Sequence, residues 1–125
     1  MRAGLEMRIA QENWKSAAII ASNLSELELT LGDLFAAMQD AERSVVYADR
    51  SGDAFQRMAR RTTHADALHQ SGHRKEALER FREAERMQAE HEPKYPKLYS
   101  LQGFRYCDLL LGEAERDADV EVAVA

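Results

Sequence analysis

Histidine is the residue type of this chain best suited to metal binding, and it occurs at positions 64, 69, 73 and 91. His69 and His73 are four residues apart, the spacing that places two side chains on one face of a helix. Gly72 lies between them at an expected helix end and interrupts that face, whereas His64 and His69 diverge. There is no ligating cysteine pair and no HExxH arrangement. The sequence therefore predicts no metal site and no cofactor.

The carboxylate pairs and the one thiol of this chain do not form a pattern typical of a catalytic site. Glu26 with Glu28 and Glu83 with Glu85 are two residues apart, which on a helix turns the members of each pair to different sides. Cys107 has no neighbouring histidine or basic residue to activate it, so we interpret it as a packed, reduced thiol. No nucleophile motif, phosphate-binding loop or dinucleotide fingerprint is present. The sequence predicts no catalytic residues and no enzyme activity.

Composition limits the partners. The 125 residues are one domain's worth of chain, with the 45% hydrophobic and 31% charged content of a folded protein. A formal charge of −5 argues against nucleic acid as a partner. The apolar runs are far shorter than the roughly 18 residues of a membrane-spanning helix. An acidic residue as early as Glu6 does not fit a secretory signal, so the expected compartment is the cytoplasm.

Glycines at regular intervals indicate the helices that carry these residues. Gly32, Gly72 and Gly112 are 40 residues apart, and each follows a long segment of helical apolar periodicity. A glycine stop joined to the next helix by one or two residues predicts an antiparallel hairpin. Such a repeat cannot bury its apolar face alone and must stack on its neighbours.

The periodicity predicts helices over residues 14–31, 34–51, 54–71 and 75–90, with a fifth from Pro93 or Pro96 to Gly112 and a partial one before residue 13. Asn13 is the expected N-cap of the first of these, and Asp53 with Gln56 matches a capping box. The expected inward positions include Leu27, Leu31, Phe55, Leu68 and Phe81. Residues 1–116 form one predicted domain and residues 117–125 a disordered tail.

Two stretches, residues 23–33 and 72–84, resemble the tetratricopeptide repeat in a long-helix variant with a 40-residue period. Gly72, Ala77, Phe81 and Ala84 match the turn glycine, small contact residues and large packing residue of that family. The resemblance implies an all-α, right-handed α-solenoid of antiparallel helix hairpins. About two full repeats with partial flanking units, or about five to six helices, are expected.

The resemblance also implies a non-enzymatic scaffold that binds a peptide or partner protein in a groove lined by the first helix of each repeat. Carried over to this chain, the candidate partner-binding residues are Ser22, Asn23, Glu26, Thr63, Asp66, Tyr99, Gln102 and Tyr106. Asn23 falls where some family members grip a peptide carboxylate. Glu26, Thr63, Asp66 and Gly103 replace the basic residues that accompany it there, which argues against that mode of binding.

Three further hypotheses remain open. Residues 99–111 are similar to repeat segments of large bacterial multidomain signalling proteins, so the alternative function is a regulatory or oligomerisation segment of such a protein. No covering helix is predicted over Leu109, Leu110 and Leu111, which makes them candidates for self-association as a homodimer through the C-terminal helix. Arg57, Arg60 and Arg61 form either a solvated face or a docking site for an acidic segment.

Overall fold

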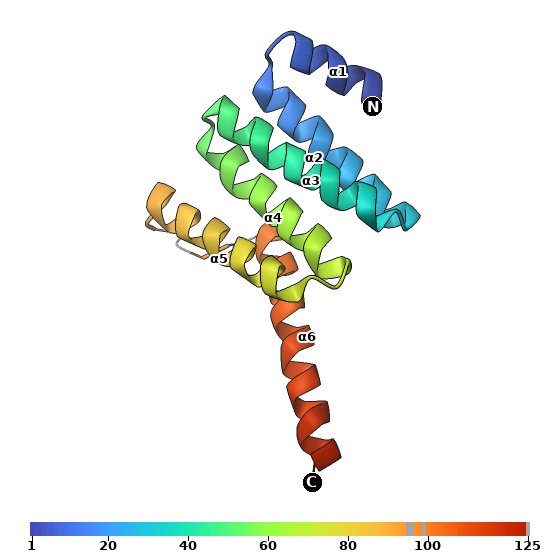
Figure 1. The fold of residues 1–125 in the computed structure, drawn as a ribbon. Helices are drawn as coiled ribbons and strands as arrows, with labels where there is room; N and C mark the ends of the chain where they lie inside the picture. Colours follow the sequence, from blue (N-terminus) through green and yellow to red (C-terminus); the bar gives the residue numbers. More distant parts are fainter. Residues whose placement is uncertain (95–96, 99, 125) are drawn as a thin grey trace.

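The computed structural model is all-helical over the part of the chain that it describes (Figure 1). It describes the backbone of residues 1–94, 97, 98 and 100–124, and their side chains except at 100, 101, 104 and 117–124. Six helices lie in these residues: α1 (Arg2–Ala10), α2 (Trp14–Leu31), α3 (Leu34–Ser51), α4 (Ala54–Gln70), α5 (Arg74–His91) and α6 (Ser100–Val124). The all-α prediction is confirmed.

The helices pack as consecutive hairpins. α2 packs against α3 and α4 against α5, and contacts of α4 with both α3 and α2 join the two hairpins (Figure 1). α1 covers the outer side of α2, and the first part of α6 packs on α4 and α5. α6 then extends away from the other helices (Figure 1). A helical array of antiparallel hairpins is thus confirmed, and its right-handed sense remains a prediction.

The predicted helix ends are largely correct. Gly32 and Gly72 have φ values of 83° and 88°, the left-handed conformation that a glycine adopts without strain. Asn13 Oδ1 accepts a hydrogen bond from the Ser16 amide at 3.3 Å, as expected of an N-cap. The capping box is only half present: Asp53 Oδ1 accepts from the Gln56 amide at 2.8 Å, but the Gln56 side chain does not reach back.

α6 departs from the prediction at both ends. It begins at Ser100 rather than at a proline, and it continues through Gly112 to Val124. A glycine inside a helix costs only about 1 kcal/mol relative to alanine. The alanine- and glutamate-rich sequence after Gly112 favours helix, so it can carry the helix past that residue. The division into a domain of 1–116 and a tail of 117–125 stays a prediction.

Small side chains let the helices approach closely. Alanines at 17, 18, 21, 37, 41, 48 and 59 are fully buried. The main apolar cluster lies between α4, α5 and α6 and contains Ala65, Leu68, Ala77, Phe81 and Leu109. Of the five inward positions named from the sequence, Leu68 and Phe81 are buried. The prediction is wrong for the other three, because Leu27, Leu31 and Phe55 are 44%, 74% and 45% exposed.

Candidate functional site

The predicted binding face is the one shared by α2, α4 and α6, and part of it is closed by packing. Ser22 Oγ and Thr63 Oγ1 are 3.1 Å apart in a buried hydrogen bond between α2 and α4. The prediction that these two residues line an accessible surface is therefore wrong, since their hydroxyls satisfy each other. They hold the first helices of the two hairpins together.

Beyond this pair, the same face carries a polar hollow of about 260 Å³, here called the first-helix depression and lined by Glu26, Leu29, Thr30, Asp66, Gln70 and Arg105. Arg105 Nη2 donates to Glu26 Oε1 at 2.6 Å, and Arg105 Nε lies 3.6 Å from Asp66 Oδ2. Gln70 Nε2 also donates to Asp66 Oδ2, at 3.0 Å. The structure thus brings Glu26 and Asp66 together around an arginine that the sequence prediction missed.

The other candidates are placed differently. Tyr106 stacks on Phe81 of α5, with ring centroids 5.1 Å apart and an interplanar angle of 11°, so it does not face the first-helix depression. Asn23 is exposed on α2, and Gln102 is half-buried on α6. Tyr99 lies outside the described residues. A 40-residue step from Asp66 points to Tyr106, one position beyond the residue that actually meets Asp66.

Charge inside the first-helix depression is nearly balanced. Burial raises the pKa of Asp66, although Arg105 and Gln70 oppose the shift. Nearby Arg60 is largely buried, which lowers the pKa of its guanidinium, and the Glu26 carboxylate partly offsets this. Two carboxylates and two guanidinium groups therefore neutralise one another, and no strong net field remains for a charged ligand.

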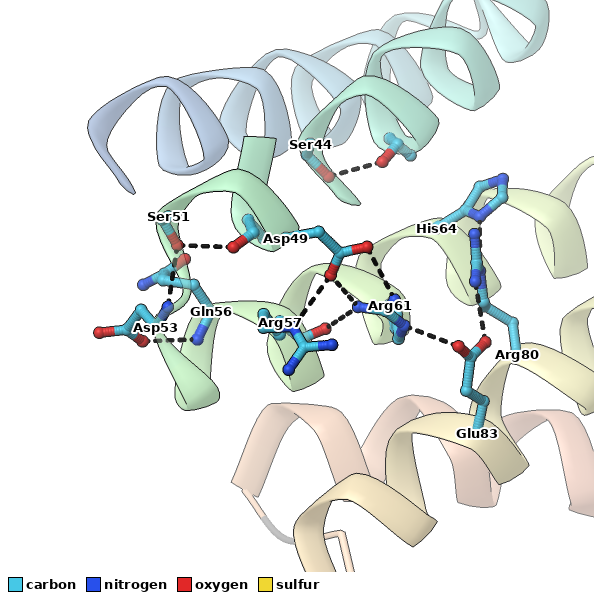
Figure 2. Close-up of polar contacts among 12 residues, drawn as sticks. Ser44, Asp49, Ser51, Asp53, Gln56, Arg57, Arg61, His64, Arg80 and Glu83 are labelled. Atoms are coloured by element: carbon cyan, nitrogen blue, oxygen red, sulfur yellow. Dashed lines mark hydrogen bonds and ion pairs between the residues drawn. The ribbon is translucent and has the colours of Figure 1, made fainter. Parts of the chain in front are cut away.

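A second polar system joins α3, α4 and α5 (Figure 2). Arg61 of α4 donates two hydrogen bonds to Asp49 of α3, at 2.8 and 2.9 Å, and its Nε donates to Glu83 of α5 at 2.9 Å. We call these three residues the Arg61 bridge. Arg57 also donates to Asp49, at 3.2 Å. The arginine cluster 57–61 is therefore mostly used within the fold, which argues against a docking site for an acidic segment there.

His64 continues this polar system toward α5. Arg80 Nε donates to His64 Nδ1 at 3.0 Å, and Arg80 Nη1 donates to Glu83 at 2.8 Å (Figure 2). Burial, assisted by the Arg80 charge, lowers the pKa of His64 to about 4. His64 is therefore neutral near pH 7 and accepts rather than donates at Nδ1.

Next to His64 lies a groove between α3, α4 and α5, here called the second-helix groove. It has a hollow of about 370 Å³ lined by Phe35, Met38, Glu42, His64, Leu68 and Glu76, among others. An adjoining hollow of about 360 Å³ shares His64, Leu68 and Glu76 and extends along α5 to Arg86. The sequence prediction missed this groove because the tetratricopeptide resemblance implies a binding face on the first helix of each repeat.

Glu28 forms a carboxyl pair that the sequence also did not reveal. It lies by Asp40 of α3, to which Arg2 of α1 donates two hydrogen bonds at 3.1 Å. Burial and the Asp40 carboxylate raise the pKa of Glu28 to about 7. Burial alone would raise the pKa of Asp40 as well, but hydrogen bonds from Glu28 and Arg2 lower it. The proton of the pair therefore resides on Glu28.

We expect Glu28→Gln to raise the melting temperature by several degrees at pH 8 and to leave it nearly unchanged at pH 5. Because the pKa of Glu28 is raised to about 7, the folded chain keeps a proton that the unfolded chain has already released. The free energy of unfolding therefore falls as pH rises toward 7, and glutamine removes that loss. Circular dichroism melts at both pH values measure it, with exposed Glu6→Gln as control; equal effects of both substitutions would contradict the assignment.

Metal binding and membrane crossing find no support among the described residues. Among the described residues, no group of three or more histidine, cysteine, aspartate or glutamate side chains is placed to hold a metal ion. Cys107 is exposed, so the interpretation of a packed thiol is wrong. Within that same part of the chain, no helix combines the length and hydropathy needed to cross a membrane.

Comparison with protein-family models, curated proteins and solved structures finds no match to this chain. The tetratricopeptide resemblance thus stays a prediction that rests on the residues quoted for it.

Proposed function

We propose that this protein is a non-enzymatic interaction scaffold of tetratricopeptide type that binds a peptide or a partner protein on a repeat surface. The observation that carries the proposal is the apolar surface around the turn between α2 and α3. Leu31 and Phe35 are 74% and 68% exposed there, and Leu27 and Leu34 are exposed beside them. Large apolar side chains gathered at one place on a folded surface are typical of a protein contact.

The rigid setting of these side chains supports the same proposal. They stand on two capped helices joined by the left-handed Gly32, so few conformations are lost when a partner binds. The first-helix depression is less suited to be the main contact, because Arg105, Glu26 and Asp66 already pair with one another. A cytoplasmic setting is part of the proposal and is supported by the single cysteine, which leaves no intrachain disulfide to form.

Selection from a library of random displayed peptides tests the proposal. The immobilised protein should enrich a family of related peptides, and Phe35→Ala should weaken their binding. Val46→Ala, which truncates another exposed apolar side chain on α3, is the matched control. Failure of the folded protein to enrich any peptide family over a blocked surface would contradict the scaffold function.

One observation favours the alternative, a regulatory or oligomerisation segment of a larger protein. Leu110 and Leu111 are 43% and 63% exposed on the part of α6 that leaves the array, whereas Leu109 is 1% exposed and packs against α4 and α5. Leu109 is therefore covered by its own chain, and the prediction that it is uncovered is wrong. Only Leu110 and Leu111 remain candidates for a homodimer contact.

If α6 associates, Leu110→Asp with Leu111→Asp should weaken the homodimer by about tenfold or more, because two carboxylates would be buried in an apolar contact. Light scattering across a concentration series measures the mass. The melting temperature should change little, since both side chains are exposed in the monomer. Val46→Asp controls for a charge placed elsewhere on the surface, and a wild-type chain that stays monomeric at high concentration would exclude the homodimer contact through α6.

A further inference from the structure

The second-helix groove is open at one end and filled at the other. α3 and α5 make no backbone contact with each other, so α4 forms the floor between them. At one end the Arg61 bridge spans the space from Asp49 to Glu83 (Figure 2). About two helical turns further along α4, at Leu68, no such bridge is present and the hollow is open. The open part is therefore bounded by α3 and α5 at its sides and by α4 beneath.

The floor and one wall of this open part are apolar. Leu68 belongs to the main core cluster, and Met38 packs against that cluster from α3. Phe35 stands above them at the start of α3 and is 68% exposed, and among the described side chains no larger apolar one has that much of its surface in water. An aliphatic or aromatic side chain inserted between Phe35 and Leu68 would remove apolar surface of both partners from water.

The rim of the groove is acidic. Glu42 on α3 and Glu79 on α5 form no ion pair within the described residues, and Glu76 has only His73, at 3.9 Å. Of the basic residues, Arg80 is committed to His64 and Glu83, and Arg86 lies at the far end. His64 is hydrogen-bonded through Nδ1 and adds no positive charge. The open end therefore presents carboxylates on both sides of an apolar floor.

We propose that the second-helix groove binds a basic amphipathic helix of a partner protein, with one large apolar side chain between Phe35 and Leu68 and lysine or arginine side chains beside Glu42 and Glu76. This rests on the proposed scaffold function. It extends the apolar surface at the α2–α3 turn, through Phe35, into the second-helix groove and names the chemistry of the partner. The net charge of −5 assists the encounter by attracting a cationic segment. An amphipathic helix laid into an apolar groove between helices is a common mode of recognition.

The acidic charge of this chain argues against a second copy of it as the occupant of the second-helix groove. The exposed leucines of α6, Leu110 and Leu111, are followed by Glu113, Glu115, Asp117 and Asp119, with only Arg116 to oppose them. Insertion of that segment would place carboxylates against Glu42 and Glu76. Like charges brought together at an interface are unfavourable, so a basic segment fits where this one does not.

A defined probe tests the proposal. A fluorescent amphipathic peptide of leucine and lysine, about 14 residues and roughly four turns long, is titrated with the full chain at low ionic strength. We expect its fluorescence anisotropy to rise to saturation, and the matched leucine and glutamate peptide to bind at least about tenfold more weakly. The double variant Glu42→Gln/Glu76→Gln and the variant Phe35→Ala should each weaken the lysine peptide by about tenfold.

Matched controls separate the groove from general charge attraction. Glu6→Gln/Glu115→Gln removes the same charge from α1 and α6, and Val46→Ala truncates an exposed apolar side chain outside the groove. These variants should bind the lysine peptide as wild type does. Equal binding of both peptides, or equal effects of groove and control variants, would overturn the proposal. Displayed peptides whose binding is weakened by Phe35→Ala but not by Glu42→Gln/Glu76→Gln would overturn it while leaving the scaffold function intact.

Discussion

Phe81→Asp should abolish the cooperative unfolding transition of this chain. Phe81 is 0% exposed, lies in the cluster between α4, α5 and α6 and stacks on Tyr106. Truncation of a buried phenylalanine costs about 3–5 kcal/mol, and an unpaired carboxylate in its place adds a desolvation penalty. A domain of this size has a stability of about 5–15 kcal/mol, so most of it would be lost. Circular dichroism during heating measures the result.

Phe55→Asp is the matched control for this prediction. It makes the same chemical change on α4, but Phe55 is 45% exposed, so the new carboxylate remains hydrated. We expect its melting temperature to stay within a few degrees of wild type. A Phe81→Asp chain that melts like the Phe55→Asp chain would contradict the packing of α5 against α6.

The sequence was most informative about helices and their ends. The helix ends at Gly32 and Gly72 could be predicted without knowing the fold, because a left-handed helix stop is a local property of the backbone. The same holds for the Asn13 cap, which depends only on an amide three residues away. Local signals of this kind predicted four of the helices to within about a residue.

The inward face of α2 could not be predicted as well. Hydrophobicity favoured Leu27 and Leu31, yet the buried positions continue through Ser22, Ser25 and the half-buried Glu28. Their polar groups face partners on other helices: Ser25 donates to the Ala37 carbonyl at 2.7 Å, and Glu28 lies beside Asp40, although Glu28 Oε1 has no hydrogen-bond partner among the described residues. Such partners are distant in sequence, so an apolar pattern cannot reveal them.

The third repeat was mispredicted for a related reason. A strict 40-residue period predicts that α6 has the same orientation in its repeat as α4 has in the second repeat. That orientation would place Tyr106 beside Asp66. Instead, Tyr106 stacks on Phe81, and this rotation turns Arg105 toward Glu26 and Asp66. An aromatic contact with the preceding hairpin therefore sets the register of α6, and the candidate site contains an arginine where the repeat pattern predicted a tyrosine.

The Arg61 bridge gives the second large expected effect, since Arg61→Ala should lower the free energy of unfolding by about 2–3 kcal/mol. The side chain is 8% exposed and holds α3 and α5 to α4 through Asp49 and Glu83. Breaking a buried ion pair typically costs about 3–5 kcal/mol, and the cost is reduced here because both carboxylates can regain water. Urea unfolding measures the change. Arg57→Ala, which removes an exposed partner of the same Asp49, should cost about 0.5 kcal/mol.

Acid should erase the difference between Arg61→Ala and wild type. The Arg61 guanidinium holds the pKa of Asp49 below its ordinary value. Burial alone would raise the pKa of Glu83, but hydrogen bonds from Arg80 and Arg61 lower it. The bridge therefore stabilises the fold at neutral pH, and its contribution is lost as pH falls through these lowered values. Urea midpoints that remain equally far apart at pH 7 and pH 3 would show that Arg61 acts through the packing of its stem rather than through its charge.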